Sequence, residues 1–326
     1  MLMPIMNKIF SFFICFLIIS CDFQKQTNST GRQLEIILVQ SENCSKEDFE
    51  LFKENLIIQQ TPLLETEIYG EIKNLFYVIP ISEKDFSSIF RTHKNIIFVN
   101  SGNSFSIQYK ENIWAKNQNV YLCSINSKER GSNQIINLSK SVSEKIKKQE
   151  IKKRVDKYKN TTPQKTQKYL EEKYNLSISL PGNFFIVDSL NGVLNLRGDT
   201  KKSTQRILIS PFASDSKIKN VISHQNQIAK NNISSEIEGS FVCIEERTKL
   251  YIDSLKTPHQ EKINIKGLWR MEGDFMGGSF FTTLVTNLKN NQKHIISLYL
   301  YAPGENKAHY LLDLESILES VKYINN

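Results

Sequence analysis

A long basic stretch divides the strand-like runs of this chain into two sets. Apolar residues recur at roughly helical spacing from about residue 133 to residue 158, and the turn-forming segment "NTTPQK" follows. Short apolar runs that are typical of strands come before it, and longer alternating runs come after it. We therefore predict an α+β fold with two halves, each a mostly antiparallel sheet with flanking helices, joined by the long basic helix.

The length of the chain is consistent with two domains of ordinary size. We predict a lipoprotein signal peptide at residues 1–20 and a flexible tether at residues 21–33. An N-terminal α+β domain is predicted at residues 34–158 and ends in the basic helix. A C-terminal α+β domain is predicted at residues 159–326.

The N-terminus carries a secretory signal. Lys8 precedes an apolar run that extends to Ile19, and the small residue Ser20 stands directly before Cys21. The run is too short to span a bilayer comfortably as a helix. The sequence "IISC" resembles the lipobox of bacterial lipoproteins, which predicts acylation of Cys21 and an exported, membrane-tethered protein. The alternatives are an ordinary signal peptide and an uncleaved anchor with an incidental cysteine.

The basic stretch is a candidate surface for an anionic partner. Residues 140–173 hold twelve Lys or Arg against five Asp or Glu, whereas the rest of the chain is close to neutral. Such a surface could attract anionic lipid, an acidic glycan, another envelope protein or nucleic acid, and export argues against nucleic acid. The alternative is a solvated helix face with one packed apolar stripe. The stripe would consist of Leu138, Val142, Ile146, Ile151 and Val155.

The segment "GLWRMEGDFMGGSFF" (residues 267–281) places two carboxylates two residues apart. Read as a strand and a glycine-rich turn, it sends Trp269 and Met271 to the core, and Asp274 accepts backbone N–H groups in the turn. Alternatively, Glu272 and Asp274 form the acid pair that glycoside hydrolysis needs, or the segment contacts a ligand. The sequence favours the structural role, which leaves Glu272 and Asp274 as weak catalytic candidates.

Other catalytic signatures are absent from the sequence. It contains no H-E-x-x-H, G-x-S-x-G, Walker or C-x-x-C motif. The five histidines are scattered, and no two cysteines have the spacing of metal ligands. The pattern "SDSK" at residues 214–217 fits the serine–lysine motif of penicillin-recognising enzymes, but its companion K-T-G is missing. We therefore expect neither a metal nor a cofactor.

Several segments resemble an uncharacterised family of bacteroidete lipoproteins, a domain of unknown function. The most specific are Trp-Ala-Lys-x-Gln at residues 114–118 and Gly-Leu-Trp-x-Met-x-Gly-Asp-x-Met-Gly-Gly at residues 267–278. The others are Cys21, "RTHKNIIFV" (91–99), "LSISLPGNF" (176–184), "YAPGENK" (301–307) and "LLDLESIL" (311–318). The resemblance implies an exported, lipid-anchored envelope protein without an assigned reaction. The second half also looks like the fold shared by photosystem extrinsic subunits and nuclear-import cofactors, which implies a binding or accessory module.

We predict a lipid-anchored cell-envelope protein that binds or scaffolds another envelope component and is not an enzyme. The candidate binding residues are Trp114, Lys116, Gln118, Trp269, Tyr301 and Lys307. One alternative is a carrier or sensor of a small ligand in a groove between the two halves. Another is an envelope hydrolase that uses Glu272 and Asp274. The tether "CDFQKQ" has no run of acidic residues of the kind associated with surface export, which favours a position facing the periplasm.

Overall fold

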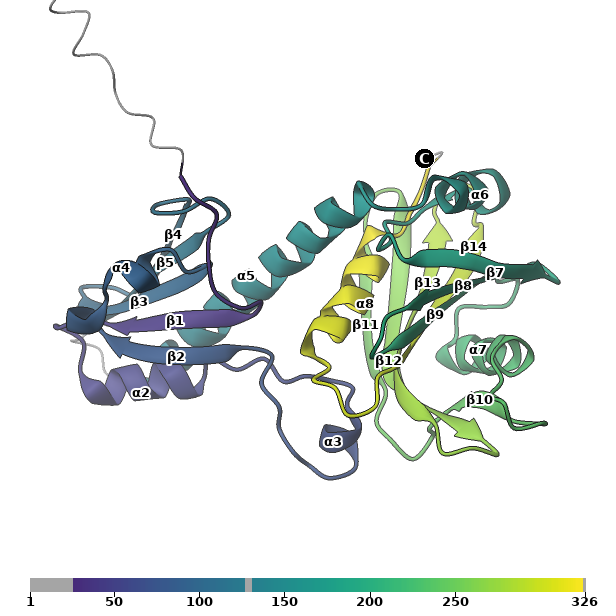
Figure 1. Cartoon of the computed structure of the whole chain (residues 1–326), viewed down its shortest axis with the longest axis horizontal. Helices are drawn as coiled ribbons and strands as arrows, with labels where there is room; N and C mark the ends of the chain where they lie inside the picture. The colour runs from purple at the N-terminus through teal and green to yellow at the C-terminus, as the bar shows by residue number, and fades with distance from the viewer. Residues whose placement is uncertain (1–25, 127–130, 325–326) are drawn as a thin grey trace, which may run out of the picture. The chain divides into compact units, whose positions relative to one another are not determined.

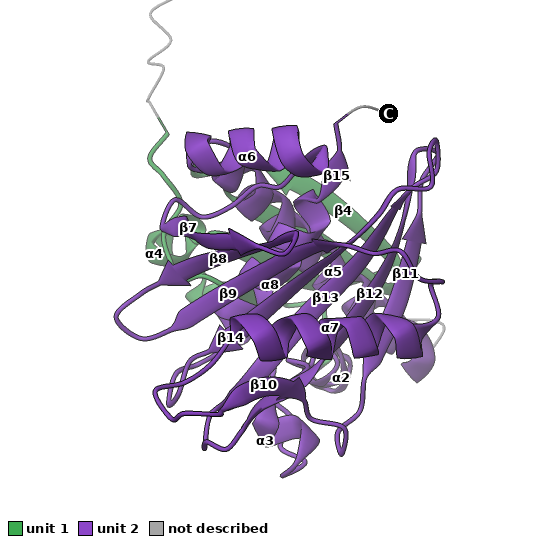
Figure 2. Cartoon of the chain, turned by 90° about the vertical axis from the view of Figure 1, so that its right-hand side faces the viewer, with its two compact units in different colours: residues 1–45, 78–128 green, residues 46–77, 129–326 purple. Residues whose placement is uncertain are grey.

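The computed structural model describes residues 26–126 and 131–324 (Figure 1). The predicted signal peptide at residues 1–20 and the predicted lipidation site at Cys21 lie outside the described residues. The chain divides into two compact units, which Figure 2 colours separately. The N-terminal unit comprises residues 1–45 and 78–128, and the C-terminal unit comprises residues 46–77 and 129–326. This division differs from the predicted boundary at residues 158/159, because the long helix packs within the C-terminal unit.

A mixed sheet forms the described part of the N-terminal unit. Its strands are β1 (Glu35–Gln40), β2 (Tyr77–Ser82), β3 (Asn95–Gly102), β4 (Ser106–Glu111) and β5 (Asn119–Asn126), in the order β2-β1-β3-β5-β4. Strand β3 pairs in parallel with both β1 and β5, and β4 pairs antiparallel with β5. The two parallel pairs of β3 differ from the predicted mostly antiparallel sheet. Residues 41–94 between β1 and β3 supply the long crossover that parallel neighbours need.

The core of this sheet is a small aliphatic cluster with aromatic side chains beside it. Two short helical turns, η2 (Glu83–Asp85) and α4 (Ser88–Arg91), precede β3. The buried members of the cluster are Ile37, Val39, Ile96 and Val120. Phe86, Phe98 and Trp114 are partly buried against it, which gives Trp114 a packing role.

The C-terminal unit is built on one large antiparallel sheet. Its strands are β7 (Phe184–Leu190), β8 (Val193–Asp199), β9 (Thr204–Pro211), β10 (Phe241–Ile244), β11 (Tyr251–Lys256), β12 (Gln260–Glu272), β13 (Gly277–Asn287) and β14 (Lys293–Tyr301). The strand order is β10-β12-β13-β14-β9-β8-β7, and β11 pairs with β12. The short strands β6 (Leu176–Ser177) and β15 (Lys322–Tyr323) pair with each other.

Helices cover both faces of this sheet, because its strands alternate apolar side chains between the two faces. The helices of the unit are α2 (Lys46–Glu54), α3 (Leu64–Glu67), α5 (Ser132–Lys159), α6 (Gln164–Tyr174), α7 (Ile218–Asn232) and α8 (Ala308–Ser320). Ile207 and Ile296 face the α8 side, where Leu314 packs against them. The neighbouring Leu208 and Ile295 face α7. Figure 2 shows α7 in front of the sheet and α8 behind it. The α+β prediction in two halves is confirmed.

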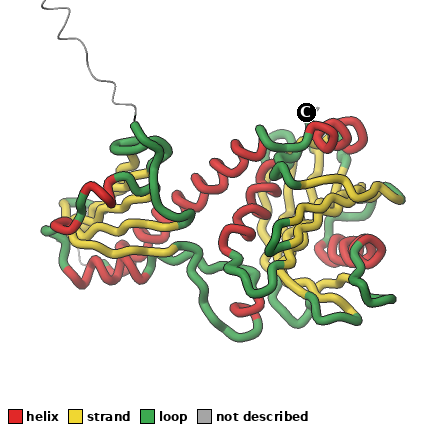
Figure 3. Tube along the Cα trace, viewed as in Figure 1, coloured by secondary structure: helices red, strands yellow, loops and turns green. Residues whose placement is uncertain are grey.

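The long helix α5 packs along α8, as Figure 3 shows in red. Its predicted apolar stripe continues only as far as Ile146. Beyond that point the buried positions follow the i+4 row and are Glu150, Arg154 and Tyr158. Ile151 and Val155, predicted in the stripe, are only partly buried. The helix therefore buries a charged row where an apolar row was expected.

A hydrogen-bonded network pairs the charges of this row, although one buried oxygen of Glu150 has no hydrogen-bond partner among the described residues. The Arg154 guanidinium binds the Glu150 carboxylate at 3.1 Å and the Asp313 carboxylate of α8 at 3.1 Å. The Tyr158 hydroxyl donates to the same Asp313 oxygen at 2.5 Å. Buried charges need such pairing because their desolvation is costly. None of the helices in the described ranges is both long and apolar enough to cross a membrane.

Candidate functional site

Trp269 lies on β12 with its indole almost fully buried. Its Nε1–H donates to the backbone oxygen of Leu300 at 3.1 Å, and its ring lies 6.4 Å from the rings of both Tyr299 and Tyr301. Gly278 is the register partner of Trp269 on β13. A Cβ at Gly278 would stand 2.0 Å from the Leu300 oxygen and 3.2 Å from the indole nitrogen. The glycine pair of this segment therefore makes room for the tryptophan.

These rings line a pocket of about 220 Å³, which we call the aromatic pocket. Trp269, Tyr299 and Tyr301 form its aromatic wall, and Met271 and Met276 add flexible thioethers. Arg197 of β8 and Arg206 of β9 line it as well. The pocket thus brings together two of the predicted binding residues, Trp269 and Tyr301, from segments about 30 residues apart in the sequence.

The two arginines stand directly opposite each other in the β8–β9 register. Like charges in this position destabilise a sheet. The Arg197 Nε lies 2.7 Å from an oxygen of Asp199, whereas Arg206 donates to the Asn195 amide oxygen at 3.2 Å. Burial, together with the charge of Arg197, lowers the pKa of Arg206 below its ordinary value. An arginine held this way beside aromatic rings is the most unusual electrostatic feature of the pocket.

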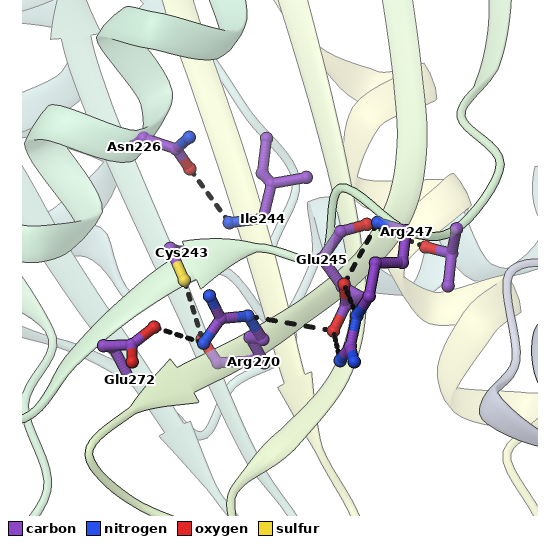
Figure 4. Close-up of polar contacts among 8 residues, drawn as sticks. Asn226, Cys243, Ile244, Glu245, Arg247, Arg270 and Glu272 are labelled. Atoms are coloured by element: carbon purple, nitrogen blue, oxygen red, sulfur yellow. Dashed lines mark hydrogen bonds and ion pairs between the residues drawn. The ribbon is translucent and has the colours of Figure 1, made fainter.

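Glu272 takes part in a chain of alternating charges on the surface, shown in Figure 4. It pairs with Arg270, and the Arg270 Nε lies 3.7 Å from the Glu245 carboxylate. Arg247 donates to both oxygens of Glu245, at 2.8 and 2.5 Å. These bonds from Arg247 lower the pKa of Glu245 to about 2. Together with Cys243, these residues line a hollow of about 620 Å³.

Asp274 lies in the β12–β13 turn and does not line that hollow. Its carboxylate accepts the backbone N–H of Phe275 at 2.6 Å. Glu272 is bound to Arg270, so the two acids do not converge on a common cleft in the described structure. Hydrolysis of a glycosidic bond needs two carboxylates that flank the bond. The geometry therefore favours the structural interpretation of this segment.

The predicted binding residues of the N-terminal unit act mainly in local structure. Gln118 is buried, and its amide group donates to the backbone oxygens of Arg91 at 2.5 Å and His93 at 2.7 Å. The Gln118 amide oxygen accepts the backbone N–H of Trp114 at 3.0 Å. Lys116 exposes its side chain, while its backbone pairs with residues 27–29. Hydrogen bonds within the N-terminal unit thus fix the conformation of the loop that carries the Trp-Ala-Lys-x-Gln motif.

Lys307 lies directly before α8. Its Nζ donates to the Glu305 backbone oxygen at 3.3 Å and lies 3.5 Å from the Glu65 carboxylate. The Lys307 side chain is partly buried, and its contact with Glu65 helps to hold the loop that contains α3. Of the predicted binding residues, Trp269 and Tyr301 are therefore the two that meet in a pocket.

Sequence reasoning missed Arg197, Arg206 and Tyr299. A charged residue in a strand is usually interpreted as facing water. The available signal was the alternation in residues 193–199 and 204–211, which places both arginines on the same face as buried Val193 and Leu208. Leu208 stands two residues after Arg206 and Val193 stands four residues before Arg197, which indicates that the arginines extend over the core.

A third, larger hollow lies within the C-terminal unit between α5, α8 and the β11–β12 hairpin. We call it the lysine groove, and its volume is about 830 Å³. The apolar side chains of Ile151, Val155 and Leu318 line it. Its lysines are Lys147, Lys148, Lys152, Lys159, Lys262, Lys266 and Lys322, against five acidic residues.

The inner lysines of this groove are already bound. Lys147 and Lys266 contact the Glu315 carboxylate at 3.0 and 2.7 Å. Lys262 donates to the Leu318 and Glu319 backbone oxygens at 2.9 and 3.1 Å, at the end of α8. Burial lowers the pKa of Lys262 to about 8. Within the described ranges, no cluster of three His, Cys, Asp or Glu residues could hold a metal ion.

Two family models match adjoining parts of the chain, and both describe a domain of unknown function. Residues 162–320 match DUF4837 and residues 29–159 match DUF8532. The chain thus carries two uncharacterised domains, which supports the predicted uncharacterised family at this level. No curated protein matches the chain.

Among solved structures, the chain is similar to the Ran-binding protein Mog1p of Saccharomyces cerevisiae. The TM-score is 0.28 at 8% identity, over 46% of this chain and 90% of that chain. A mutant of Mog1 gives a TM-score of 0.27 at 7% identity, over 47% of this chain and 92% of that chain.

Proposed function

We propose that this protein is a non-catalytic binding module of the cell envelope that holds a small ligand, or one side chain of a partner, in the aromatic pocket. The observation that supports this proposal is the meeting of Trp269, Tyr299 and Tyr301 around a hollow that two arginines also line. Binding pockets typically combine apolar walls with a few placed polar groups.

The size of the pocket favours a small ligand. Its volume of about 220 Å³ lies below the roughly 300–1,000 Å³ of sites for drug-sized ligands. One ring with a short polar group is therefore the kind of molecule that fits. Glu272 and Asp274 are both engaged by neighbours, which weighs against the hydrolase alternative. The alternative of a small-ligand carrier is retained, but the ligand is now placed in a pocket of the C-terminal unit instead of a groove between the two halves.

The two indole groups of the chain provide a direct binding assay. We expect phenylacetate, added to the ¹⁵N-labelled full chain in detergent, to shift the Nε1–H signal of Trp269. The signal of Trp114 should stay in place, because that ring belongs to the N-terminal unit. The measurement is a titration by two-dimensional ¹H–¹⁵N NMR.

Tyr301→Ala should weaken this response at least about fivefold, because it removes one aromatic wall and ring contacts of this kind contribute roughly 1 kcal/mol. Tyr109→Ala, which truncates an exposed tyrosine on β4, is the matched control and should leave the response unchanged. A Trp269 signal that stays constant up to high phenylacetate concentration would remove the proposed function.

We also propose that the chain is anchored to a membrane through acylated Cys21 and faces the periplasm. The lipobox supports this, and the lysine groove supports a second, electrostatic contact with anionic lipid or another anionic envelope component. Lys148, Lys152 and Lys322 line the groove and make no ion pair within 4.0 Å among the described residues. Exposed lysines attract anionic groups, and salt weakens this attraction by screening the charges.

Cys21→Ser should move the chain from the membrane fraction to the soluble fraction, because several acyl chains contribute about 0.8 kcal/mol per buried methylene. Cys44→Ser is the control and should leave the chain in the membrane fraction.

The soluble Cys21→Ser chain should still bind anionic vesicles in a salt-sensitive way. Adding Lys148→Glu and Lys152→Glu to it should remove this binding. Lys145→Glu with Lys157→Glu makes the same charge change outside the groove. Membrane retention of the Cys21→Ser chain in high salt would contradict the anchor.

A further inference from the structure

We propose that the ligand of the aromatic pocket carries a carboxylate, and that the Arg206 guanidinium binds it. This inference rests on the proposed function, because it names the chemical class of the ligand for the same pocket.

Arg206 is half-buried and has no carboxylate partner in the part of the chain that the structure describes. A guanidinium offers five N–H donors, and one of those of Arg206 is bound, to the neutral amide oxygen of Asn195. No carboxylate lies within 4.0 Å of it among the described residues. Desolvating a cation without a counter-ion costs free energy, which is reflected in the lowered pKa of Arg206. An anionic ligand would remove this cost.

The two carboxylates that attract Arg206, those of Asp199 and Asp188, both lie beyond ion-pair distance from it. Asp199 forms an ion pair with Arg197, whose Nε lies 2.7 Å away, and accepts a hydrogen bond from the Thr204 hydroxyl at 3.0 Å. Burial alone would raise the pKa of Asp199, but these bonds and both arginine charges outweigh it and hold the pKa below its ordinary value. Asp188 accepts from the Asn195 amide at 3.3 Å through one oxygen, and its other, buried oxygen has no hydrogen-bond partner among the described residues. Asp188 attracts Arg206 only from beyond ion-pair distance.

The strand register places the cation next to the rings. Arg206 of β9 is opposite Tyr299 of β14, and Thr204 is opposite Tyr301. Residues directly opposite each other in an antiparallel pair have Cβ atoms about 4.5–5.5 Å apart. A ring packed against Trp269 and Tyr301 would thus have its substituent within reach of Arg206 when one or two carbons separate the two groups. A planar carboxylate matches the fork of a guanidinium.

The same three rings could form a cage for a cation, since Trp and Tyr faces attract ammonium groups. The electrostatics argue against this occupant. Both arginines of the pocket would repel a cation, and the acids that offset their charge are bound away from the rings. An anion with an apolar body satisfies the rings and Arg206 together.

The test compares phenylacetate with phenylacetamide, which has the same shape without the charge. Both are titrated against the full chain, and the Trp269 indole signal is followed. We expect phenylacetate to bind about tenfold more tightly or better, because hydrogen bonds to charged groups are roughly twice as strong as neutral ones. Arg206→Gln, which keeps a donor for Asn195, should bring the two affinities together. Arg206→Lys keeps the charge without the fork and should retain part of the preference.

Arg247→Gln is the matched control, because it removes one exposed arginine that does not line the pocket. It should leave the preference for phenylacetate unchanged. Acetate is the third probe, and competition by acetate as effective as by phenylacetate would overturn the inference in favour of a bare anion site. Equal binding of acid and amide to the unaltered chain would overturn the carboxylate assignment alone. No response to either would overturn the proposed function as well.

Discussion

Gly278→Ala is expected to lower the free energy of unfolding of the C-terminal unit by about 3 kcal/mol or more, at the upper end of the range for overpacked interiors. The added Cβ would stand 2.0 Å from the backbone oxygen of Leu300, which is the acceptor of the Trp269 indole hydrogen bond. Backbone cannot move aside as a flexible side chain does, so β13 must separate from β14 at this position. The aromatic pocket should be lost together with the stability.

The measurement is urea unfolding in a Trp114→Phe background, in which the emission reports on Trp269 alone. Gly273→Ala on the same hairpin is the control. Its Cβ would be 3.6 Å from the nearest atom, and its φ of +82° makes alanine strained, at a cost of roughly 1–2 kcal/mol. Equal stability of the Gly278→Ala chain and the unaltered chain would show that the strands do not approach each other as described.

The second large effect is expected on acidification. His294 on β14 is buried, and burial lowers its pKa to about 4 from the ordinary 6.5. The unfolded chain therefore binds a proton at His294 below about pH 6.5, whereas the folded chain resists it until about pH 4. Stability contributed by neutral His294 is present above pH 6.5 and is lost as the pH falls toward 4. The loss should reach about 3 kcal/mol at 1.36 kcal/mol per pKa unit.

His294→Asn should flatten this pH dependence, because asparagine does not titrate and its amide can replace the hydrogen bond between Nδ1 and the Tyr323 hydroxyl, 3.0 Å apart. The variant starts from lower stability at pH 7 because the ring contact with Tyr174 is lost. The measurement is the midpoint of urea unfolding at a series of pH values. His259→Asn, at an exposed position, should leave the profile unchanged. Parallel profiles for His294→Asn and the unaltered chain would assign the acid sensitivity to other groups.

The sequence allowed the α+β class and the most useful segment to be predicted. Alternation in residues 267–281 correctly placed Trp269 and Met271 in the core. The partner of Asp274 was also predicted as a backbone N–H group. These features depend on local patterns, which the sequence carries directly.

The remaining features depend on which segments become neighbours. The juxtaposition of Arg197 and Arg206 requires the β8–β9 register, and the parallel pairs of β3 require a choice of partner between distant segments. In α5, the lysines suggested a solvated face, whereas Arg154 is buried because Asp313 of α8 faces it. Charged residues are assigned to water by default, so the sequence alone did not indicate these positions.

The aromatic pocket is proposed to bind a small apolar carboxylate. A crystal structure of the full chain soaked with phenylacetate would show the ligand and its partners. We expect density for the ring between Trp269 and Tyr301, with the carboxylate on the Arg206 guanidinium. Density at another site only, or Arg206 paired with Asp188 while Met276 fills the pocket, would contradict the proposal.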